Sequence, residues 1–360
     1  MRIFLIFILV GFISCRSDNE TARVVFLEND LPSPLQLSGV KHDLNLDFVL
    51  NPKQVLIKNN TLIIAERKSV KDEKIHLFDL DTKKYNRSVG KDGLGPGEIT
   101  MAYPLLDDGK EGSFWVYDKQ QFKFSQFLFA DTVKTASHQF KGLEVPYFIT
   151  AVDWTSENTL IVNLVDGWSK YLEITTGGDT ISSFGNWQDM VLDRDLPNGL
   201  KPEDFEANLI ATVHQGVIRG NKSKTKFIKA GSSVDYVDII DLKHRQIKTI
   251  FGPVDEFPEL KISKSMGYQM PNYNINTLTS KYLDAFAGEE SFFVLYLGKS
   301  YRQISEEIDL NRIFEFDYQG NILNHYHIDY PLMGFTVDEV NRKIYGVTID
   351  EDPGIVEFDY

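Results

Sequence analysis

Cysteine is almost missing from this chain, because Cys15 is the only one among its 360 residues. A single cysteine excludes a disulfide framework and any zinc or iron–sulfur centre that needs several thiolates. Basic residues are also scarce, since 38 lysines and arginines stand against 52 aspartates and glutamates. The resulting net charge of −14 argues against a nucleic-acid-binding protein, which needs a basic surface to displace counterions from phosphates.

Sustained helical periodicity is lacking too, and residues 202–211 form the best of a few weak candidate helices. After the N-terminal segment, no apolar run reaches the length of about 20 residues that a membrane-spanning helix requires. The chain is nevertheless 42% hydrophobic and contains 25 phenylalanines and 16 tyrosines, which excludes disorder as its overall state. We therefore expect a folded body with a large core that is built mainly from strands.

Recognisable catalytic signatures are missing, since the sequence has no Gly-x-Ser-x-Gly elbow and no His-Glu-x-x-His pattern. The glycine-rich run at residues 93–98 does not suit a phosphate loop, because Pro96 lacks an N–H donor and no helix follows; a tight turn is expected instead. His325 and His327 lie on one face of an expected strand, but no third ligand for zinc or copper can be assigned. We predict no catalytic residue, no metal site and no cofactor.

The first residues are typical of a secretory signal peptide. Arg2 is followed by the apolar run Ile3–Val10 and by a small-residue exit that ends at Ser14. Cys15 comes directly after Ser14, and the four residues that end in Cys15 resemble the lipobox of bacterial lipoproteins. We therefore predict a signal peptide over residues 1–14 and lipidation of Cys15, which would anchor the protein to a membrane without crossing it.

The residues after Cys15 read Arg-Ser-Asp-Asn-Glu. This small acidic cluster resembles the export signal that sends some Gram-negative lipoproteins to the cell surface, and a solvated flexible tether explains it equally well. The expected location is the cell envelope, with a lipid anchor in the outer membrane and the body on either the periplasmic or the surface side.

A short repeat organises the rest of the chain, in which apolar runs alternate with turns rich in Gly, Asn and Asp. An apolar residue followed by Asp, or once by Thr, recurs before a turn, and the Asp side chain can cap that turn. The first and last intervals of the repeat match the roughly 40–45 residues of a plain four-stranded propeller blade. The six landmark positions are Asp79, Asp118, Thr175, Asp241, Asp317 and Asp359.

Six landmarks predict an all-β fold, a six-bladed β-propeller. Because Asp359 is almost the last residue, no room is left for a final outer strand, and a segment within residues 22–48 is expected to supply it and close the ring. We therefore predict a tether and closing strand over residues 15–45 and one propeller over residues 46–360.

The same residues carry a family resemblance. Lys91–Glu98 resembles the Gly-Pro-Gly-Glu signature of the TolB-like six-bladed β-propeller lipoproteins of Gram-negative bacteria. Residues 294–298, 314–321 and 336–345 resemble the late blades of that family, so the resemblance covers most of the chain from about residue 45 onward. It implies a propeller fold and an envelope location, and it implies no catalytic residues, because the family is largely uncharacterised.

The middle intervals of the repeat are longer than a plain blade needs, and we assign the surplus to Asn186–Asn208, Pro253–Lys281 and Gly298–Asn311. Insertions in a repeat protein become loops, and loops on a rigid scaffold carry function. If these loops gather at one mouth of the propeller, they form a recognition surface; inert loops with their aromatic side chains tucked beneath them explain the sequence equally well. The candidate binding residues are Trp187, Tyr268, Tyr273, Tyr301 and Arg302.

Two hypotheses of function follow. The preferred one is a lipid-anchored, non-enzymatic binding or scaffold protein, whose partners are the membrane, through lipidated Cys15, and an unidentified envelope protein or glycan. The alternative is a propeller hydrolase or lyase that acts on a polysaccharide or lactone with carboxylates at the central channel. The alternative predicts convergent Asp, Glu, Asn or His side chains at one end of the channel, so the channel lining bears on the choice.

Overall fold

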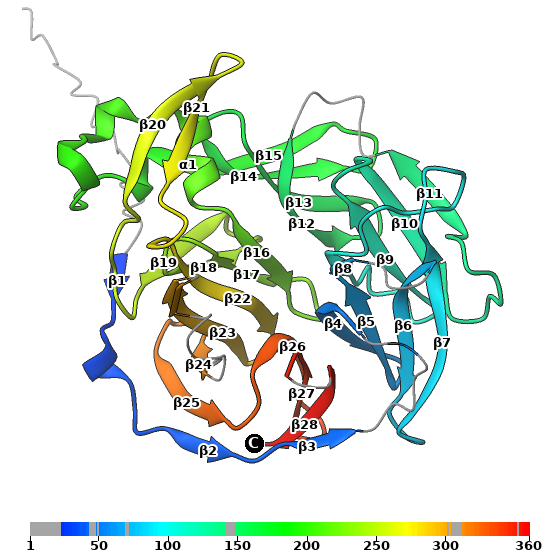
Figure 1. Ribbon diagram of the computed structural model, residues 1–360. Helices are drawn as coiled ribbons and strands as arrows, with labels where there is room; N and C mark the ends of the chain where they lie inside the picture. The colour runs from blue at the N-terminus through cyan, green and yellow to red at the C-terminus, as the bar shows by residue number, and fades with distance from the viewer. Residues whose placement is uncertain are drawn as a thin grey trace, which may run out of the picture.

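Six antiparallel sheets circle a common axis in the computed structural model of the protein (Figure 1). The structure describes residues 23–42, 48, 50–68, 72–141, 148–300, 302–303, 312–350 and 353–360. The fold is an all-β six-bladed propeller, which confirms the prediction from the six sequence landmarks. Among the described residues, no helix is both long enough and apolar enough to span a membrane. The predicted signal peptide and Cys15 lie outside the described residues.

The strands of each blade follow the chain from the axis to the rim. The strands of the first three blades are β4 (Pro52–Lys58), β5 (Thr61–Glu66), β6 (Glu73–Asp79) and β7 (Lys84–Lys91); β8 (Leu105–Leu106), β9 (Ser113–Asp118), β10 (Lys123–Leu128) and β11 (His138–Lys141); and β12 (Ile149–Ser156), β13 (Thr159–Leu164), β14 (Ser169–Thr175) and β15 (Thr180–Asn186).

The last three blades contain strands from both ends of the chain. Their strands are β16 (Gly216–Gly220), β17 (Lys226–Gly231), β18 (Tyr236–Asp241) and β19 (Gln246–Phe251); β22 (Thr279–Ala287), β23 (Ser291–Ser300), β24 (Arg312–Asp317) and β25 (Ile322–Ile328); and β26 (Leu332–Asp338), β27 (Lys343–Thr348), β28 (Gly354–Asp359) and β3 (Val40–His42).

The core lies between neighbouring blades, because each sheet packs both of its faces against the next sheets around the ring. Leu62, Ile63 and Ile64 of β5 are consecutive residues, and each is at most 1% exposed, as burial on both faces requires. One core cluster joins Ile63 and Leu77 of blade 1 to Phe114 of blade 2. Two-sided burial is the reason that these strands have continuous apolar runs in the sequence.

The landmark aspartates do not all occupy the same place in a blade. Asp118 ends β9, the second strand of blade 2, whereas the other five landmarks end the third strand of their blades. The uniform repeat unit is therefore wrong for blade 2, and the physical reason is a separate structural role. The fully buried Asp118 carboxylate accepts hydrogen bonds from the N–H groups of Thr100, at 2.6 Å, and Met101, at 3.1 Å. It thereby holds the connection from blade 1 against blade 2.

The Gly-Pro-Gly-Glu run lies in this connection and forms the expected tight turn between blades. Gly97 has a φ of 76°, and a Cβ atom at this position would lie 2.8 Å from the Cβ of Thr135, so the turn requires glycine here. The Glu98 side chain accepts a hydrogen bond from the Gly95 N–H at 2.8 Å and pairs with the Lys91 ammonium at 2.7 Å. The signature is thus explained by turn structure and needs no ligand.

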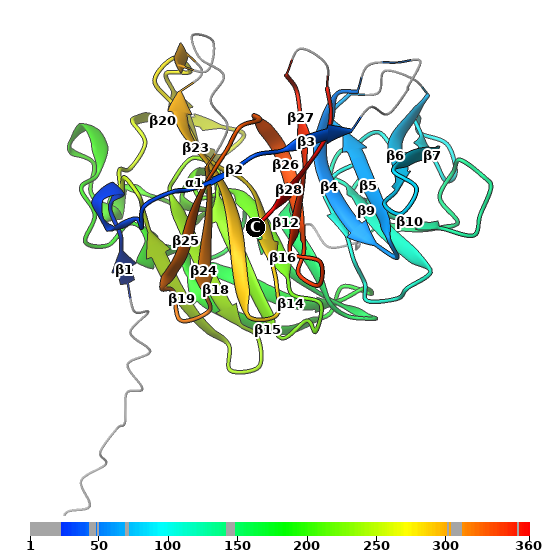
Figure 2. The ribbon, with the colours of Figure 1, turned by 90° about the horizontal axis from the view of Figure 1, so that it is seen from below.

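Residues 23–42 form an N-terminal strap along the rim of three blades (Figure 2). The strand β1 (Arg23–Val25) pairs in parallel with β19 of blade 4, and β2 (Leu35–Leu37) pairs in parallel with β25 of blade 5. The short 3₁₀ helix η1 (Glu28–Asp30) lies between them. At the end of the strap, β3 pairs antiparallel with β28 and completes blade 6. The predicted ring closure by an N-terminal strand is confirmed, and the two additional rim strands were not predicted.

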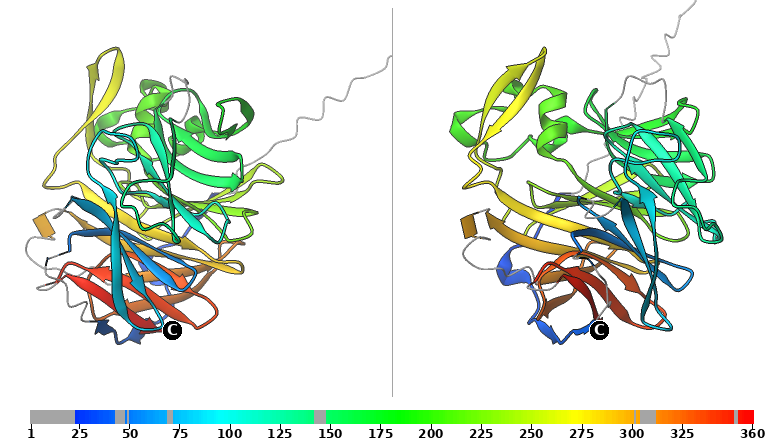
Figure 3. Two further views of the ribbon diagram at one scale, coloured as in Figure 1. Left: turned by 90° about the vertical axis from the view of Figure 1, so that its right-hand side faces the viewer. Right: turned by 45° about the vertical axis from the view of Figure 1, so that its right-hand side comes forward.

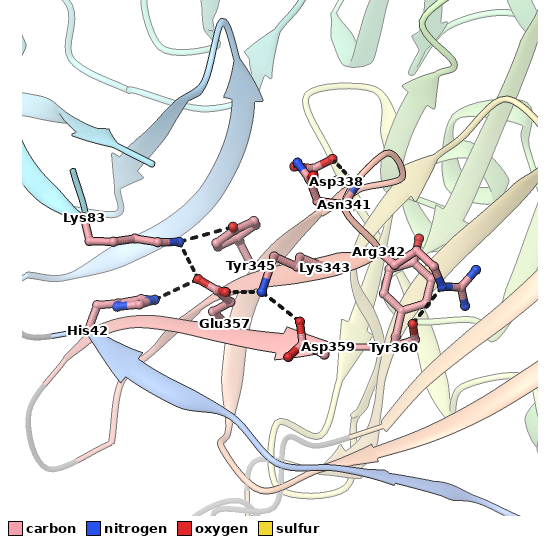
Figure 4. Close-up of polar contacts among 10 residues, drawn as sticks. All are labelled: His42, Lys83, Asp338, Asn341, Arg342, Lys343, Tyr345, Glu357, Asp359 and Tyr360. Carbon is pink, nitrogen blue, oxygen red and sulfur yellow. Dashed lines mark hydrogen bonds and ion pairs between the residues drawn. The ribbon is translucent and has the colours of Figure 1, made fainter. Parts of the chain in front are cut away.

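A polar cluster around Glu357 of β28 joins the closing strand to the first and last blades (Figure 4). The Glu357 carboxylate contacts His42 of β3 at 3.0 Å, Lys83 in the β6–β7 turn of blade 1 at 2.5 Å, and Lys343 of β27. Burial alone would raise the pKa of Glu357, but the hydrogen bonds from Lys343, Lys83 and His42 outweigh burial and lower this pKa to about 2. The charged form of Glu357 therefore stabilises the closed ring.

We expect Glu357→Gln to lower the free energy of unfolding by about 1–2 kcal/mol at pH 7. An unfolded glutamate has a pKa of about 4.3, so the stabilisation from the charged carboxylate is complete above this pH. It is lost as the pH falls through about 2, the pKa in the folded protein. Urea unfolding of both proteins at pH 7, 4 and 2 should show a difference that shrinks toward pH 2. A difference that is the same at every pH would contradict this explanation.

Candidate binding face and central channel

All three surplus segments leave the propeller on one face, which we call the loop face. Two of them connect the outer strand of a blade to the inner strand of the next, from β15 to β16 and from β19 to β22. The third connects β23 to β24 within blade 5. In an antiparallel blade, both kinds of connection lie at the end where the inner strand begins. The chain topology therefore gives the segments a shared face, as the hypothesis of a common mouth requires.

The first two segments pack together and project from the same side of the propeller in both views of Figure 3. The amide of Asn208 donates a hydrogen bond to the Gln269 carbonyl at 2.7 Å, and the Glu206 N–H donates to the Gln269 side chain at 2.9 Å. The elements of this unit are η2 (Trp187–Met190), η3 (Pro197–Gly199), η4 (Pro202–Asp204), α1 (Ala207–Val213), β20 (Leu260–Ser265) and β21 (Tyr268–Tyr273). The expected helix at 202–211 is thus only partly α-helical.

Trp187 is fully buried beneath the loop face, with an exposed fraction of 0%. Its ring lies 4.8 Å from the ammonium of Lys229 and 5.8 Å from that of Lys170, measured to the ring centroid. Such cation–π contacts stabilise buried ammonium groups. The structure therefore places Trp187 in the core, where it orders the loop base, and away from the exposed surface that a ligand would contact.

The two lysines beside Trp187 belong to a buried charge cluster that contains one carboxylate, Asp238. Lys170 lies 2.7 Å from Asp238, which also accepts a hydrogen bond from the Tyr171 hydroxyl at 2.6 Å. Lys229 donates to the carbonyl of His214 at 2.7 Å. Burial lowers the pKa of Lys229 well below its ordinary value, which the attraction of Asp238 only partly offsets. Asp238 therefore supplies the negative charge that compensates the two buried ammonium groups.

Tyr268 lies at an exposed groove of about 570 Å³ on the loop face. Trp168, in the turn between β13 and β14, lines the same groove, and the two side chains are 48% (Trp168) and 46% (Tyr268) exposed. Three acidic residues accompany them: Asp166, Glu203 and Glu206. The groove thus combines two exposed aromatic rings with hydrogen-bond acceptors, and three separate segments of the chain build it.

The other predicted binding residues are not gathered at this groove. Tyr273, at the end of β21, is half-buried and packs against the apolar core beneath the loop face. Arg302 is exposed, in the connection from β23 to β24. Tyr301 lies outside the described residues. Of the four predicted residues that the structure describes, Tyr268 alone lines the groove, so the role of the set in binding stays a prediction.

Trp168 was missed in the sequence because it lies outside the three surplus segments. Asp166 and Gly167 do mark a turn just before Trp168, but Trp187 follows a similar pair, Gly185 and Asn186, and is fully buried. A preceding turn therefore does not identify the exposed tryptophan.

A second cavity, of about 210 Å³, lies in the central channel near the end where the inner strands begin. Its lining combines apolar residues with polar and charged ones, and the charges come from four different blades. The charged residues that line it are Lys53 of β4, Lys119 after β9, Arg219 of β16 and Asp284 of β22.

Only one of the three cations in this cavity has a carboxylate partner. Asp284 binds Arg219 at 2.9 Å and also accepts a hydrogen bond from the Phe335 N–H at 3.3 Å. Lys119 donates to the carbonyl of Thr150, which carries no net charge. Lys53 forms no hydrogen bond or ion pair with any residue in the described part of the chain. Asp284 is the single carboxylate among the residues that line the cavity.

The surroundings of Lys53 and Lys119 disfavour the charged form of both side chains. Burial lowers the pKa of Lys119 to about 8, and the nearby charges of Arg219 and Lys53 act in the same direction. Burial also lowers the pKa of Lys53, and Asp284 offsets this only in part because Arg67 and Arg219 oppose it. The cavity is therefore a local excess of positive charge inside an acidic protein, and a bound anion would relieve it.

His325 and His327 lie together on β25, with ring centroids 4.7 Å apart, as their spacing predicted. Burial lowers the pKa of His325 to about 4, and the neighbouring charge of Arg312 contributes. Within the described ranges, no group of three or more His, Cys, Asp or Glu side chains is arranged to hold a metal ion.

Comparison with known proteins bears first on the fold. No curated protein matches the sequence. A Bacteroides fragilis NCTC 9343 structure named "Putative exported protein" is similar to this chain, with a TM-score of 0.56 and 13% sequence identity, and the similarity covers 93% of this chain and 98% of that one. A member of the DUF4221 family from Bacteroides vulgatus ATCC 8482 is similar with a TM-score of 0.52 and 9% identity, over 91% of this chain and 96% of that one. At these identities, the likeness shows the fold alone.

A family model supplies the assignment that distant structures cannot. The model described as TolB-like 6-blade propeller-like matches residues 38–340, a range that runs from the end of the N-terminal strap into blade 6. The resemblance of the Gly-Pro-Gly-Glu turn and the late blades points to the same group. This chain belongs to the TolB-like six-bladed propeller family.

Proposed function

We propose that this protein is a lipid-anchored, non-enzymatic binding module of the cell envelope, and that the groove at Trp168 and Tyr268 holds a glycan. The signal-like residues 1–14 and the lipobox-like context of Cys15 support export and anchoring in the outer membrane. A distant fold neighbour that is named as exported supports the same compartment. The location of the body, periplasmic or on the cell surface, does not alter the proposal.

The exposed pair of Trp168 and Tyr268 is the observation that carries this function. Flat aromatic rings offer rigid contact area to the apolar faces of sugar rings, and neighbouring carboxylates accept hydrogen bonds from sugar hydroxyls. Because Glu203 and Glu206 are exposed beside the groove, an anionic chain would be repelled. The expected ligand is therefore a neutral or amino-bearing glycan.

The hydrolase alternative finds less support in the geometry of the channel. A glycosidase needs two carboxyl groups that flank the scissile bond. The described residues that line the channel cavity supply one carboxylate, Asp284, and Arg219 already engages it. The charged lining is dominated by cations, which favours binding over paired-carboxylate chemistry.

We expect Trp168→Ala and Tyr268→Ala each to weaken glycan binding about tenfold or more, because exposed aromatic anchors carry much of the energy of such contacts. Binding is measured by isothermal titration of the full chain with the strongest neutral or amino-bearing glycan from an array of bacterial glycans. Phe122→Ala is the matched control, because this exposed aromatic lies in blade 2 and does not line the groove. It should change the affinity less than twofold, and all three variants should retain the thermal midpoint of the wild type.

Two outcomes would reject the proposal. If no glycan on the array binds, the ligand class is wrong. If a glycan binds but all three variants bind it as the wild type does, the groove is not the site.

A further inference from the structure

The cavity in the central channel carries two positive charges that the described part of the chain does not neutralise. Arg219 is matched by Asp284, whereas Lys53 forms no hydrogen bond or ion pair with a described residue and Lys119 contacts a neutral carbonyl. Both lysines are half-buried, so water screens them less well than it screens surface lysines. Desolvated like charges in one cavity oppose folding, and a protein tolerates such an arrangement when a ligand compensates it.

We propose that this cavity binds a small dianionic oxyanion of the phosphate type. Two unmatched ammonium groups equal the charge of such an ion, and polar residues of the lining such as Gln215 and Ser232 can donate further hydrogen bonds. A volume of about 210 Å³ admits a small polyatomic anion, and it is too small for a polymer. This site is separate from the groove at Trp168 and Tyr268, and the two have no lining residue in common.

The arrangement of the cations suits capture from the loop face. Lys53 is near the start of the inner strand β4, and Lys119 is in the turn after β9, so both lie toward the face on which the inner strands begin. Arg219 lies deeper along its strand, where Asp284 fixes the guanidinium. An anion that enters from the loop face would thus meet the two free ammonium groups first.

The test is isothermal titration of the full chain with inorganic phosphate, at constant ionic strength maintained with chloride. Lys53→Met and Lys119→Met should each weaken phosphate binding about tenfold, and the double variant about a hundredfold, because each removes one charge-assisted contact. Lys243→Met is the matched control, since Lys243 is an exposed lysine in the turn after β18 and does not line the cavity. It should leave the affinity within twofold of the wild type.

The pH dependence gives a second, independent measurement. Sulfate, which stays a dianion across this range, should bind more weakly as the pH rises from 7 to 9, because Lys119, whose pKa is about 8, loses its proton. The groups that face Lys119 and Lys53 are Arg67, Arg219, Asp284 and Tyr103, and none of the charged ones has an ordinary pKa between 7 and 9. In Lys119→Met, the dependence should be much weaker.

Three further titrations distinguish the possible sources of the anion and the ways in which the proposal could be wrong. Sulfate in place of phosphate tests for charge and shape without protonation, and phenyl phosphate tests whether a phosphate monoester enters as well as the free ion. Chloride that competes with phosphate at equal concentration would overturn the assignment of a polyatomic dianion. The proposal also fails if wild type does not bind phosphate at millimolar concentration, or if the two lysine variants, folded by circular dichroism, bind it as wild type does.

Discussion

Replacing Asp118 with alanine is expected to lower the free energy of unfolding by about 3–5 kcal/mol. The carboxylate is fully buried at the junction of blades 1 and 2, and each of its oxygens accepts several hydrogen bonds. Alanine leaves these donors, most of which are partly buried, without their acceptor, and each buried group left unsatisfied costs about 1–3 kcal/mol. The donors are the N–H groups of Thr100, Met101, Gln120 and Gln121, the Thr100 hydroxyl and the Gln121 side-chain amide.

Asp79→Ala is the matched control for Asp118, because both residues belong to the same sequence repeat. The Asp79 carboxylate lies in an exposed turn and accepts hydrogen bonds from the N–H, at 2.7 Å, and the hydroxyl, at 2.8 Å, of Thr82. Water can replace it, so we expect a loss of about 1 kcal/mol or less. Urea unfolding of both variants measures the difference. Equal losses would show that Asp118 merely caps its own turn, as the repeat pattern suggests.

Asp238→Asn should lower the free energy of unfolding by a similar amount, about 3–5 kcal/mol, through charge. The carboxylate is 0% exposed, and it is the acidic partner of Lys170, which is 2% exposed. Asparagine has nearly the same shape but leaves the Lys170 ammonium buried without a counter-charge. The measurement is chemical denaturation at pH 7, with the near-ultraviolet signal of Trp187 as a local probe of the cluster.

Two controls decide whether charge is the cause. Asp241→Asn changes a residue on the same strand whose ion pair with Lys226 is partly exposed, so a loss below about 1 kcal/mol is expected. The double variant Lys170→Met with Asp238→Asn removes both charges and should recover a large part of the stability lost in the single variant. A double variant that is less stable than Asp238→Asn would show that packing, and not the unpaired charge, dominates.

Much of the fold could be predicted from the sequence, because a repeated sheet needs a repeated turn. The five aspartates and Thr175 before turns predicted the number of blades, and the position of Asp359 predicted the need for a closing strand. The rim strands β1 and β2 could not be predicted, since each is three residues long and pairs through backbone groups, which leave little pattern in the side chains. Asp118 was misplaced in the blade because turn capping and loop anchoring require the same residue type.

The candidate sites were predicted less well, because they depend on residues that are distant in the sequence. Lys53, Lys119 and Arg219 come from three blades and look like ordinary surface cations until the ring brings them together. Trp187 and Trp168 are both aromatic residues near turns, and the sequence does not show which one is covered. The buried lysines that pack on Trp187 decide this, and burial of a lysine is rare enough that no pattern favours it.

The N-terminal strap has a consequence for the order in which the protein can assemble during synthesis. The strap is synthesised before the blades, yet its hydrogen-bond partners come much later in the chain. The Gly39 N–H donates to Asp329, 290 positions later, and the His42 ring contacts Glu357, 315 positions later. The backbone groups of the strap therefore stay without their partners until blades 4, 5 and 6 have been synthesised in turn. Chains that stall before blade 6 would leave β3 without its partner strand β28, so a chaperone that covers extended segments should matter most for the N-terminal strap.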